Sequence, residues 1–143
     1  IEFEEIKQLN RSLSGKGIIR GLHFQKEPYC QAKIVECLKG KVLDVVVDIR
    51  EGSSTYGQWT SIILTPEEGN QLFVPRGFAH GFVSLEDDSL FQYIVDNDYM
   101  PSSEGGILWS DPDLNIDWQL EENNNSSDVA QALREVFGNE NNK

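Results

Sequence analysis

The stretch KIVECLKGKVLDVVVDIR, residues 33–50, decides the fold because it contains two strand-like runs joined at a glycine. Val, Ile and Leu dominate both runs, as they do in strands, and Gly40 between the runs allows a turn. In the second run Asp44 and Asp48 share one pleat face, because side chains alternate along a strand. A face with two carboxylates is polar, so we expect it either to be exposed to solvent or to line a cavity.

The same succession of strand-like runs and turns continues on both sides of this stretch, from about residue 16 to 95. Further strand-like runs separated by turn residues are QWTSIIL (58–64), QLFVPRGFAHGFVSL (71–85) and SLFQYIV (89–95). Short strands at this spacing, without helical periods between them, predict an antiparallel sandwich or barrel. We therefore predict an all-β domain that spans residues 1–143, with its core between about residues 6 and 118.

A helical pattern is found near the end of the chain. In SSDVAQALREVFG, residues 126–138, Val129, Leu133 and Val136 have the i, i+4, i+7 spacing of one helix face. A serine can cap its start and Gly138 can end it. We predict a short helix here, between a loop that begins at residue 121 and a disordered tail.

Composition limits the classes of partner. The chain has 24 acidic and 12 basic residues and a net charge of −12, which argues against nucleic-acid binding. A few basic side chains that converge on a pocket can still hold a diphosphate. No apolar run approaches the ~20 residues that span a bilayer. Cys30 and Cys37 lack a paired spacing, so we expect a cytoplasmic protein with free thiols.

His23, in GIIRGLHFQK (residues 17–26), is one of only two histidines. A catalytic metal site usually has several histidines, often as His-x-His, but the position two residues on is Gln25, and His80 lies far along the chain. The pattern predicts no metal. His23 is then either a buried neutral side chain or an acid–base group that takes and returns a proton near neutral pH.

Three charged residues lie in apolar strand sequence, namely Arg20, Lys33 and Asp48. Such charges are normally paired or at a ligand site, although a solvent-facing position is the alternative. Strict alternation would place Arg20 and His23 on opposite faces. A bulge or bend at Gly21 would bring them to one face, which would indicate a pocket.

Aromatic residues complete the candidates. Tyr93 shares a face with Phe91 and is either a core aromatic or, beside a positive charge, a proton donor. Tyr99 lies in loop sequence and can stack on a flat ring. We expect Trp109 and Trp118 to be hydrophobic plugs.

Four motifs in order resemble the dTDP-4-dehydrorhamnose 3,5-epimerase family, over about residues 6–118. They are GIIRGLHFQ (17–25), QAKIVECLKGKVLDVVVDIREGSSTYGQW (31–59), VPRGFAHGFVSL (74–85) and YIVDNDYMPSSEGGILWSDPDLNIDW (93–118). The resemblance implies a cupin-type jelly-roll barrel that uses no metal or cofactor and forms a homodimer. It also implies an isomerase that inverts carbon 3, carbon 5 or both of a dTDP-linked 4-keto-6-deoxyhexose through an enolate.

The resemblance also assigns roles. His23 would be the base and Tyr93 the acid, Lys33 would stabilise the enolate, and Asp48 would pair with Lys33 or hold it in place. The positions that match substrate-binding residues are Gln8, Asn10, Arg20, Lys33, His80, Tyr99 and Glu104, with Arg11 and Ser12 beside them. Of these, Arg20 suits the diphosphate and Tyr99 suits stacking on the thymine.

Two parts of the family pattern differ in this chain. The family has a segment ahead of the stretch that matches IKQLN (6–10), which supplies an arginine and a glutamate and helps to form the dimer; this chain starts near its end. The family also pairs its base with an aspartate, for which Asp128 is the candidate, although Asp128 equally suits the first turn of the predicted helix. Two alternatives therefore stay open: a 3,4-ketoisomerase of the same substrate class, and a non-catalytic subunit that binds sugar nucleotides.

Overall fold

The apolar runs expected to be strands all form strands in the computed structural model, which describes residue 3 and residues 5–120. They are β3 (Lys33–Lys39), β4 (Val42–Asp48), β5 (Trp59–Leu64), β6 (Gln71–Val74), β7 (Phe78–Ser84) and β8 (Ser89–Val95). The run that contains His23 forms β2 (Ile19–Gln25). These segments were predictable because β-branched and aromatic residues dominate them and turn residues separate them.

Two strands and a helical turn lie outside the expected runs. β1 (Gln8–Ser14) is mostly polar, but it pairs with β8 along its whole length. β9 (Glu104–Gly106) has two glycines among its three residues, and it follows η1 (Pro101–Ser103), a single turn of 3-10 helix. Neither strand has an apolar run of its own, so the ladder with a neighbouring strand holds each of them in place.

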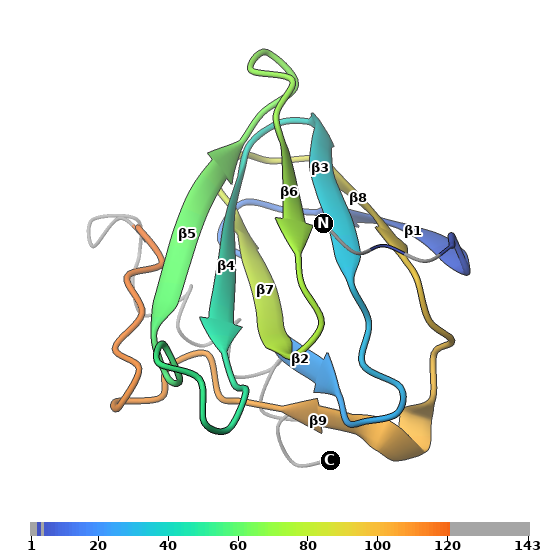
Figure 1. The fold of residues 1–143 in the computed structure, drawn as a ribbon. Coiled ribbons are helices and arrows are strands. Elements are labelled where there is room, and N and C mark those ends of the chain that lie inside the picture. The colour runs from blue at the N-terminus through green and yellow to red at the C-terminus, as the bar shows by residue number, and fades with distance from the viewer. Residues whose placement is uncertain (1–2, 4, 121–143) are drawn as a thin grey trace.

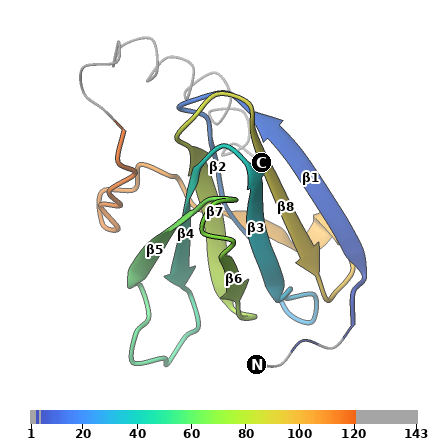
Figure 2. The ribbon, with the colours of Figure 1, turned by 90° about the horizontal axis from the view of Figure 1, so that it is seen from above.

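The strands form two antiparallel sheets that face each other (Figure 1). Their orders are β1-β8-β3-β6 and β5-β4-β7-β2-β9. Neighbouring strands are seldom consecutive in the chain, because the chain crosses from one sheet to the other, as Figure 2 shows from above. This is the jelly-roll arrangement, and the predicted all-β class is confirmed.

The central strands of the five-stranded sheet, β4 and β7, are buried on both faces. The inner face of the sheet packs on the four-stranded sheet through a cluster that includes Val46, Phe82 and Phe91. The outer face of the sheet forms a second cluster, which includes Val45, the buried Trp118 and, packed against them, Ile107 from the segment that follows β9. The predicted role of Trp118 and Trp109 as hydrophobic plugs is confirmed, because both belong to this second cluster.

The four-stranded sheet differs, because its outer face is open in the described part of the chain. On this face Leu9 and Leu13 of β1 are 51% and 60% exposed. The predicted helix at residues 126–138, with its flanking loop and tail, lies outside the described residues. Among the residues that are described, no helix is long and apolar enough to cross a membrane.

Candidate active site

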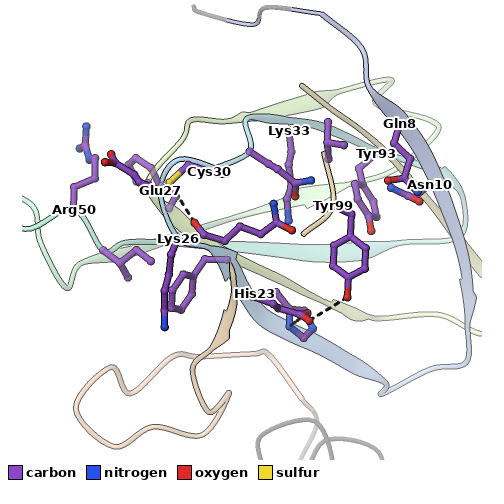
Figure 3. Close-up of a pocket in the computed structure, with 18 of the residues that line it drawn as sticks. Gln8, Asn10, His23, Lys26, Glu27, Cys30, Lys33, Arg50, Tyr93 and Tyr99 are labelled. Carbon is purple, nitrogen blue, oxygen red and sulfur yellow. Dashed lines mark hydrogen bonds and ion pairs between the residues drawn. The ribbon is translucent and has the colours of Figure 1, made fainter. Parts of the chain in front are cut away.

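A cavity of about 860 Å³ opens between the two sheets (Figure 3). Both sheets and the loops at one end of the sandwich contribute to its wall. The residues that carry the argument are Gln8, Asn10, His23, Lys33, Tyr93, Tyr99 and Glu104. Side chains that are distant in the sequence therefore meet in one cavity.

The local structure of β2 turns His23 into this cavity. Arg20 lies opposite Phe82 of β7, but His23 lies opposite His80, so β2 contains one residue more than β7 over this interval. The bulge lies at Gly21, whose φ is +126° and where a Cβ would lie 2.6 Å from the Cα of Gly81. Only glycine fits such a position. The bulge expected here is confirmed, and it puts Arg20 and His23 on the same inner face.

Arg20 lies on that face but is not part of the cavity lining. Its Nε donates to Oγ of Ser14 at 3.2 Å, and its charge acts to lower the pKa of Tyr93. The two weaker candidates beside it on β1 also lie outside the lining. Arg11 points to the opposite face of the sheet, where its Nε donates to Gln92 Oε1 at 2.7 Å, and Ser12 faces inward opposite Phe91.

The opposite wall carries Lys33 and Tyr93, from neighbouring strands. The Lys33 ammonium lies 5.5 Å from the centre of the Tyr93 ring. Burial lowers the pKa of Lys33 to about 8, against the opposing effect of the negative charges of Asp44 and Glu104. Burial raises the pKa of the Tyr93 phenol, and Glu104 adds to this effect while Arg20 opposes it. At neutral pH this wall therefore presents an ammonium and a protonated phenol.

Behind the lining lies a buried ion pair that the sequence interpretation missed. Nε2 of His80 lies 2.9 and 2.8 Å from the two carboxylate oxygens of Asp44, and both side chains are buried. Burial raises the pKa of Asp44, while the charges of His80 and Lys33 oppose that shift. A carboxylate in so apolar a strand needs a partner, so the reasoning applied to Asp48 could also have singled out Asp44.

The rim of the cavity carries Tyr99 and Glu104. The Tyr99 hydroxyl donates to Glu104 Oε2 at 3.1 Å, and Glu104 Oε1 lies 3.8 Å from Nδ1 of His23. Figure 3 shows Tyr99 and His23 close together. The three side chains reach this arrangement because β9 pairs with β2, which puts Gln25 opposite Glu104 and leaves His23 diagonal to it.

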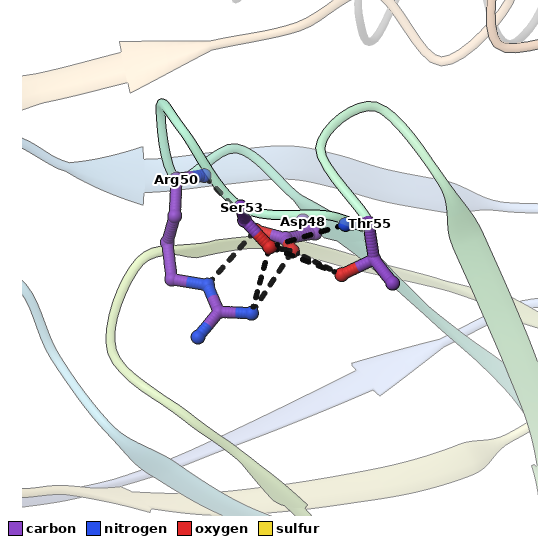
Figure 4. A network of polar contacts seen from close by, with 4 residues as sticks. All are labelled: Asp48, Arg50, Ser53 and Thr55. Atoms are coloured by element: carbon purple, nitrogen blue, oxygen red, sulfur yellow. Dashed lines mark hydrogen bonds and ion pairs between the residues drawn. The ribbon is translucent and has the colours of Figure 1, made fainter.

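The expected pairing of Asp48 with Lys33 is wrong. The Asp48 carboxylate accepts hydrogen bonds from Nε and Nη2 of Arg50, at 3.0 and 2.9 Å, and from the hydroxyls of Ser53 and Thr55 (Figure 4). Hydrogen bonds from Arg50, above all, hold its pKa well below its usual range. Asp48 thus fixes the loop after β4, because all these partners lie within seven residues of it in the chain.

The polar face of β4 is therefore neither exposed nor part of the cavity lining, contrary to both expectations. Asp44 and Asp48 are each 1% exposed or less, and each is satisfied by its own partners. Asp128, the expected partner of His23, lies outside the described residues. Within residues 3 and 5–120, no three His, Cys, Asp or Glu side chains are grouped so that they could hold a metal ion.

Fold and cavity together define a jelly-roll protein with a cavity lined by ionisable side chains between its sheets. A family profile described as dTDP-4-dehydrorhamnose 3,5-epimerase matches residues 2–135. The chain belongs to this family. The resemblance of the four sequence motifs is thereby confirmed.

Individual relatives agree with the family match. A dTDP-4-dehydrorhamnose 3,5-epimerase of Shigella flexneri is 50% identical over 117 residues, which cover 82% of this chain and 65% of that protein. The crystal structure of the epimerase from Elizabethkingia anophelis NUHP1 has a TM-score of 0.81 and 48% identity, and covers 82% of this chain and 64% of that one. The chain spans less than two thirds of the length of these relatives.

A solved complex adds a ligand to the comparison. The dTDP-6-deoxy-D-glucose-3,5-epimerase of Legionella pneumophila Philadelphia 1, crystallised with dTDP-4-keto-L-rhamnose, has a TM-score of 0.79 and 47% identity. The match covers 82% of this chain and 62% of that chain.

Proposed function

We propose that this protein epimerises a dTDP-linked 4-keto-6-deoxyhexose at carbon 3, carbon 5 or both. The observation that carries the proposal is that His23 and Tyr93 line the same cavity from opposite sheets, with Lys33 beside the tyrosine. The family match and the ligand of the Legionella structure support this substrate class.

In the proposed reaction the ketone at carbon 4 acidifies the hydrogens on the neighbouring carbons. His23 removes one of these protons, the C–H electron pair moves toward the ketone, and an enolate forms. The Lys33 ammonium stabilises the charge on the enolate oxygen, as a preorganised cation does in a site with little water. Tyr93 then donates its phenolic proton to the opposite face of the carbon, which inverts the centre. Solvent returns a proton to Tyr93 and takes one from His23.

The protonation states favour this division of roles. A half-exposed imidazole can exchange its proton with water, whereas the pKa of Tyr93 is raised, so the phenol holds its proton until an enolate needs it. Of the remaining family positions, Gln8, Asn10, Tyr99 and Glu104 line the cavity and would hold the sugar nucleotide, whereas Arg20 and His80 lie outside the lining.

The test is uptake of deuterium from heavy water into a dTDP-4-keto-6-deoxyhexose, followed by NMR of the product. We expect exchange at carbon 3, carbon 5 or both in the wild type, and loss of exchange in His23→Asn. Tyr93→Phe should still allow exchange but yield little inverted product, because the base remains and the acid is lost. Binding without exchange in the wild type would overturn the proposal, and a 3-keto product would identify a ketoisomerase instead.

We further propose that the protein works as a homodimer and that the open outer face of the four-stranded sheet forms the contact. On this face Leu9, Ile94, Ile34 and Phe73 form one apolar row across all four strands. The neighbouring row is polar. It has a positive side chain toward one edge of the sheet and a negative side chain toward the other. Such a face is self-complementary, because a two-fold axis would set the positive end of one copy against the negative end of the other.

The polar row is built from Arg11, Gln92 and Glu36. Gln92 accepts from Arg11 at 2.7 Å and donates to Glu36 at 3.1 Å, so both charged groups are held in place on the surface. Light scattering should give twice the monomer mass. Arg11→Glu should weaken the dimer, and the double change Arg11→Glu with Glu36→Arg should restore it. A monomeric wild type, or no rescue, would contradict the proposed contact.

The two free thiols, Cys30 and Cys37, support a cytoplasmic location.

A further inference from the structure

Gln25, the last residue of β2, has a side-chain amide that is bonded to the backbone through both of its ends. The residue is 8% exposed and belongs to the cavity lining. Its Nε2 donates to the backbone carbonyls of Tyr29 at 2.7 Å and Asp98 at 3.0 Å, and its Oε1 accepts from the backbone N–H of Met100 at 2.8 Å. Both amide hydrogens are thus donated within the protein, so Gln25 has none left to offer to a ligand.

Two of these backbone partners lie on either side of Tyr99. The carbonyl of Asp98 precedes this tyrosine, the N–H of Met100 follows it, and the Gln25 amide bonds to both. The amide thus satisfies two backbone groups that would otherwise need a neighbouring strand or water. Only a side chain with both a donor and an acceptor can do this, so an ionised carboxylate or an ammonium could not replace it.

The ring of Tyr99 is exposed and is held by polar contacts. The residue is 54% exposed, its hydroxyl donates to Glu104 Oε2 at 3.1 Å, and its backbone is fixed by Gln25. Figure 3 shows the ring beside His23 in the cavity. Because so exposed a ring is not locked by a packed core, its orientation depends on these contacts at its two ends. An aromatic ring that is exposed and yet fixed suits stacking on a flat ligand.

We propose that Gln25 is a positioning residue for Tyr99, which holds the ring where a nucleobase can stack on it. The choice of a nucleobase rests on the proposed function, whereas the contacts of Gln25 do not. The roles that the family resemblance assigns do not include Gln25. A loop that is already ordered avoids the entropic cost of ordering when the ligand binds. Loss of these bonds should therefore weaken ligand binding without changing His23.

Other bonds tie the same loop to the protein and have to be separated from those of Gln25. The Asn97 amide donates to the backbone carbonyls of Pro28 and Cys30, at 3.1 and 3.2 Å. These bonds hold the start of the loop, ahead of Tyr99, and do not involve Gln25. A change at Gln25 should therefore loosen the loop around Tyr99 while its start stays attached.

The first test is amide hydrogen exchange of the protein without any ligand. Gln25→Met keeps the length of the side chain and adds no charge, but it removes all three bonds. We expect the amide of Met100 and its neighbours in the loop to exchange at least about tenfold faster, because this part of the loop opens more often. Should Gln25→Met fail to fold, Gln25→Glu takes its place. It keeps an acceptor for Met100, loses both donors, and should also speed exchange around Tyr99.

Asn70→Leu is the matched control. The Asn70 amide also bridges two backbone groups, since it donates to the carbonyl of Ile63 at 2.9 Å and accepts from the N–H of Thr65 at 3.3 Å. It lies in the turn between β5 and β6, at the other end of the sandwich from β9 in Figure 1. The control should speed exchange in that turn and not around Tyr99. Unchanged exchange around Tyr99 in the Gln25 variant, or an equal change there in the control, would overturn the inference.

The second test is the binding of dTDP, measured by titration calorimetry. We expect Gln25→Met to weaken binding about three- to tenfold, the loss typical of a side chain that has to be ordered on binding. Asn70→Leu should change the affinity by less than about twofold. In the background of Tyr99→Ala, the Gln25 change should add less than about twofold, because the ring through which it acts is gone. Effects that multiply in full would show that Gln25 does not act through Tyr99.

Kinetics give a third readout. In deuterium exchange into the keto sugar, Gln25→Met should raise KM and leave kcat within about twofold, because the reacting groups are unchanged. A fall in kcat at unchanged KM would contradict a role in positioning Tyr99. A wild type that does not bind dTDP would overturn the proposed substrate class, whereas unchanged hydrogen exchange in Gln25→Met would refute the role of Gln25. The two proposals therefore fail separately.

Discussion

The two histidines of this protein lie opposite each other on neighbouring strands, yet their surroundings differ in almost every respect. His80 lies behind the cavity wall, 6% exposed at its side chain, with its Nε2 within 2.9 Å of both oxygens of a fully buried Asp44. His23 lies in the cavity, 39% exposed, with Glu104 at 3.8 Å. Each carboxylate is the diagonal neighbour of its histidine across a strand pair. The same local geometry therefore yields a fixed structural pair where it is buried and a group that can exchange protons where it is open.

The largest effect is expected from breaking the buried pair. Asp44→Ala leaves His80 without its partner in an interior that water cannot reach. Removal of one member of a buried pair typically costs about 3–5 kcal/mol, so the free energy of unfolding should fall by that amount. Urea unfolding at pH 7 measures it. A loss below about 1 kcal/mol would mean that the buried pair contributes no more than an exposed one.

The open histidine should show the opposite profile. His23→Asn changes a half-exposed side chain, so we expect the free energy of unfolding to move by no more than about 0.5 kcal/mol. Deuterium exchange into the keto sugar should fall by about 10²–10⁴-fold, because a general base is lost. If the variant were as unstable as Asp44→Ala, His23 would be a structural residue and the contrast between the two histidines would disappear.

Lys33 should make the exchange rate depend on pH. Its ammonium group interacts with the carboxylates of both histidine pairs, Asp44 and Glu104. Burial lowers its pKa from 10.5 to about 8, so it is charged below that pH and neutral above it. If the charge stabilises the enolate, the exchange rate should fall about tenfold per pH unit above about 8. Lys33→Arg keeps its charge throughout and should lack this fall. An unchanged fall in that variant would assign it to another group.

The same pKa has a consequence for stability. Between pH 8 and 10 the unfolded chain keeps the Lys33 proton that the folded protein has lost. Since stability rises with pH wherever the unfolded state binds more protons, Lys33 contributes an increase over this interval. We would measure the free energy of unfolding in urea for the wild type and Lys33→Met at pH 7.5 and 9.5. It should change more favourably with pH in the wild type than in the variant. Parallel behaviour of the two proteins would contradict the lowered pKa.

The smallest effect is expected at Asp48, the other buried carboxylate of β4. Asp48→Asn weakens hydrogen bonds that stay within one loop, so the free energy of unfolding should fall by about 1–2 kcal/mol. Exchange should change less than about threefold, because Asp48 contacts neither Lys33 nor His23 through any of these bonds. Ser53→Ala, which removes one partner, should have a smaller effect of the same sign. Loss of exchange at unchanged stability would restore the catalytic role first expected for Asp48.

Much of this arrangement could be predicted from the sequence, and the exceptions have a common cause. The strands around β4 follow from their Val and Ile content, and the bulge follows from a glycine between Arg20 and His23. The partners of Asp44 and Asp48 did not follow, because a charge in an apolar strand signals that a partner exists without identifying it. Asp44 meets His80 only because β4 and β7 are paired in one register, which is set by the whole sheet.

The two strands that the sequence did not predict also depend on pairing with distant parts of the chain. β1 and β9 have little apolar sequence of their own, and their pairing with β8 and β2 defines them. Glu104 was assigned to substrate binding by family resemblance, but its place beside His23 depends on the β2–β9 register. Local composition thus predicts elements, whereas the contacts between functional groups depend on long-range pairing.

The bulge at Gly21 decides which side of β2 each following side chain occupies. Leu22 belongs to the outer apolar cluster with Trp118, while His23 faces the cavity. If β2 kept all its residues but lacked the bulge, simple alternation from Arg20 onward would exchange these two sides. The strand would then present a leucine to the cavity and bury an imidazole among tryptophans, with no change in any reactive residue. In this family a search for lost activity should therefore include the glycine of the bulge as well as the reactive residues.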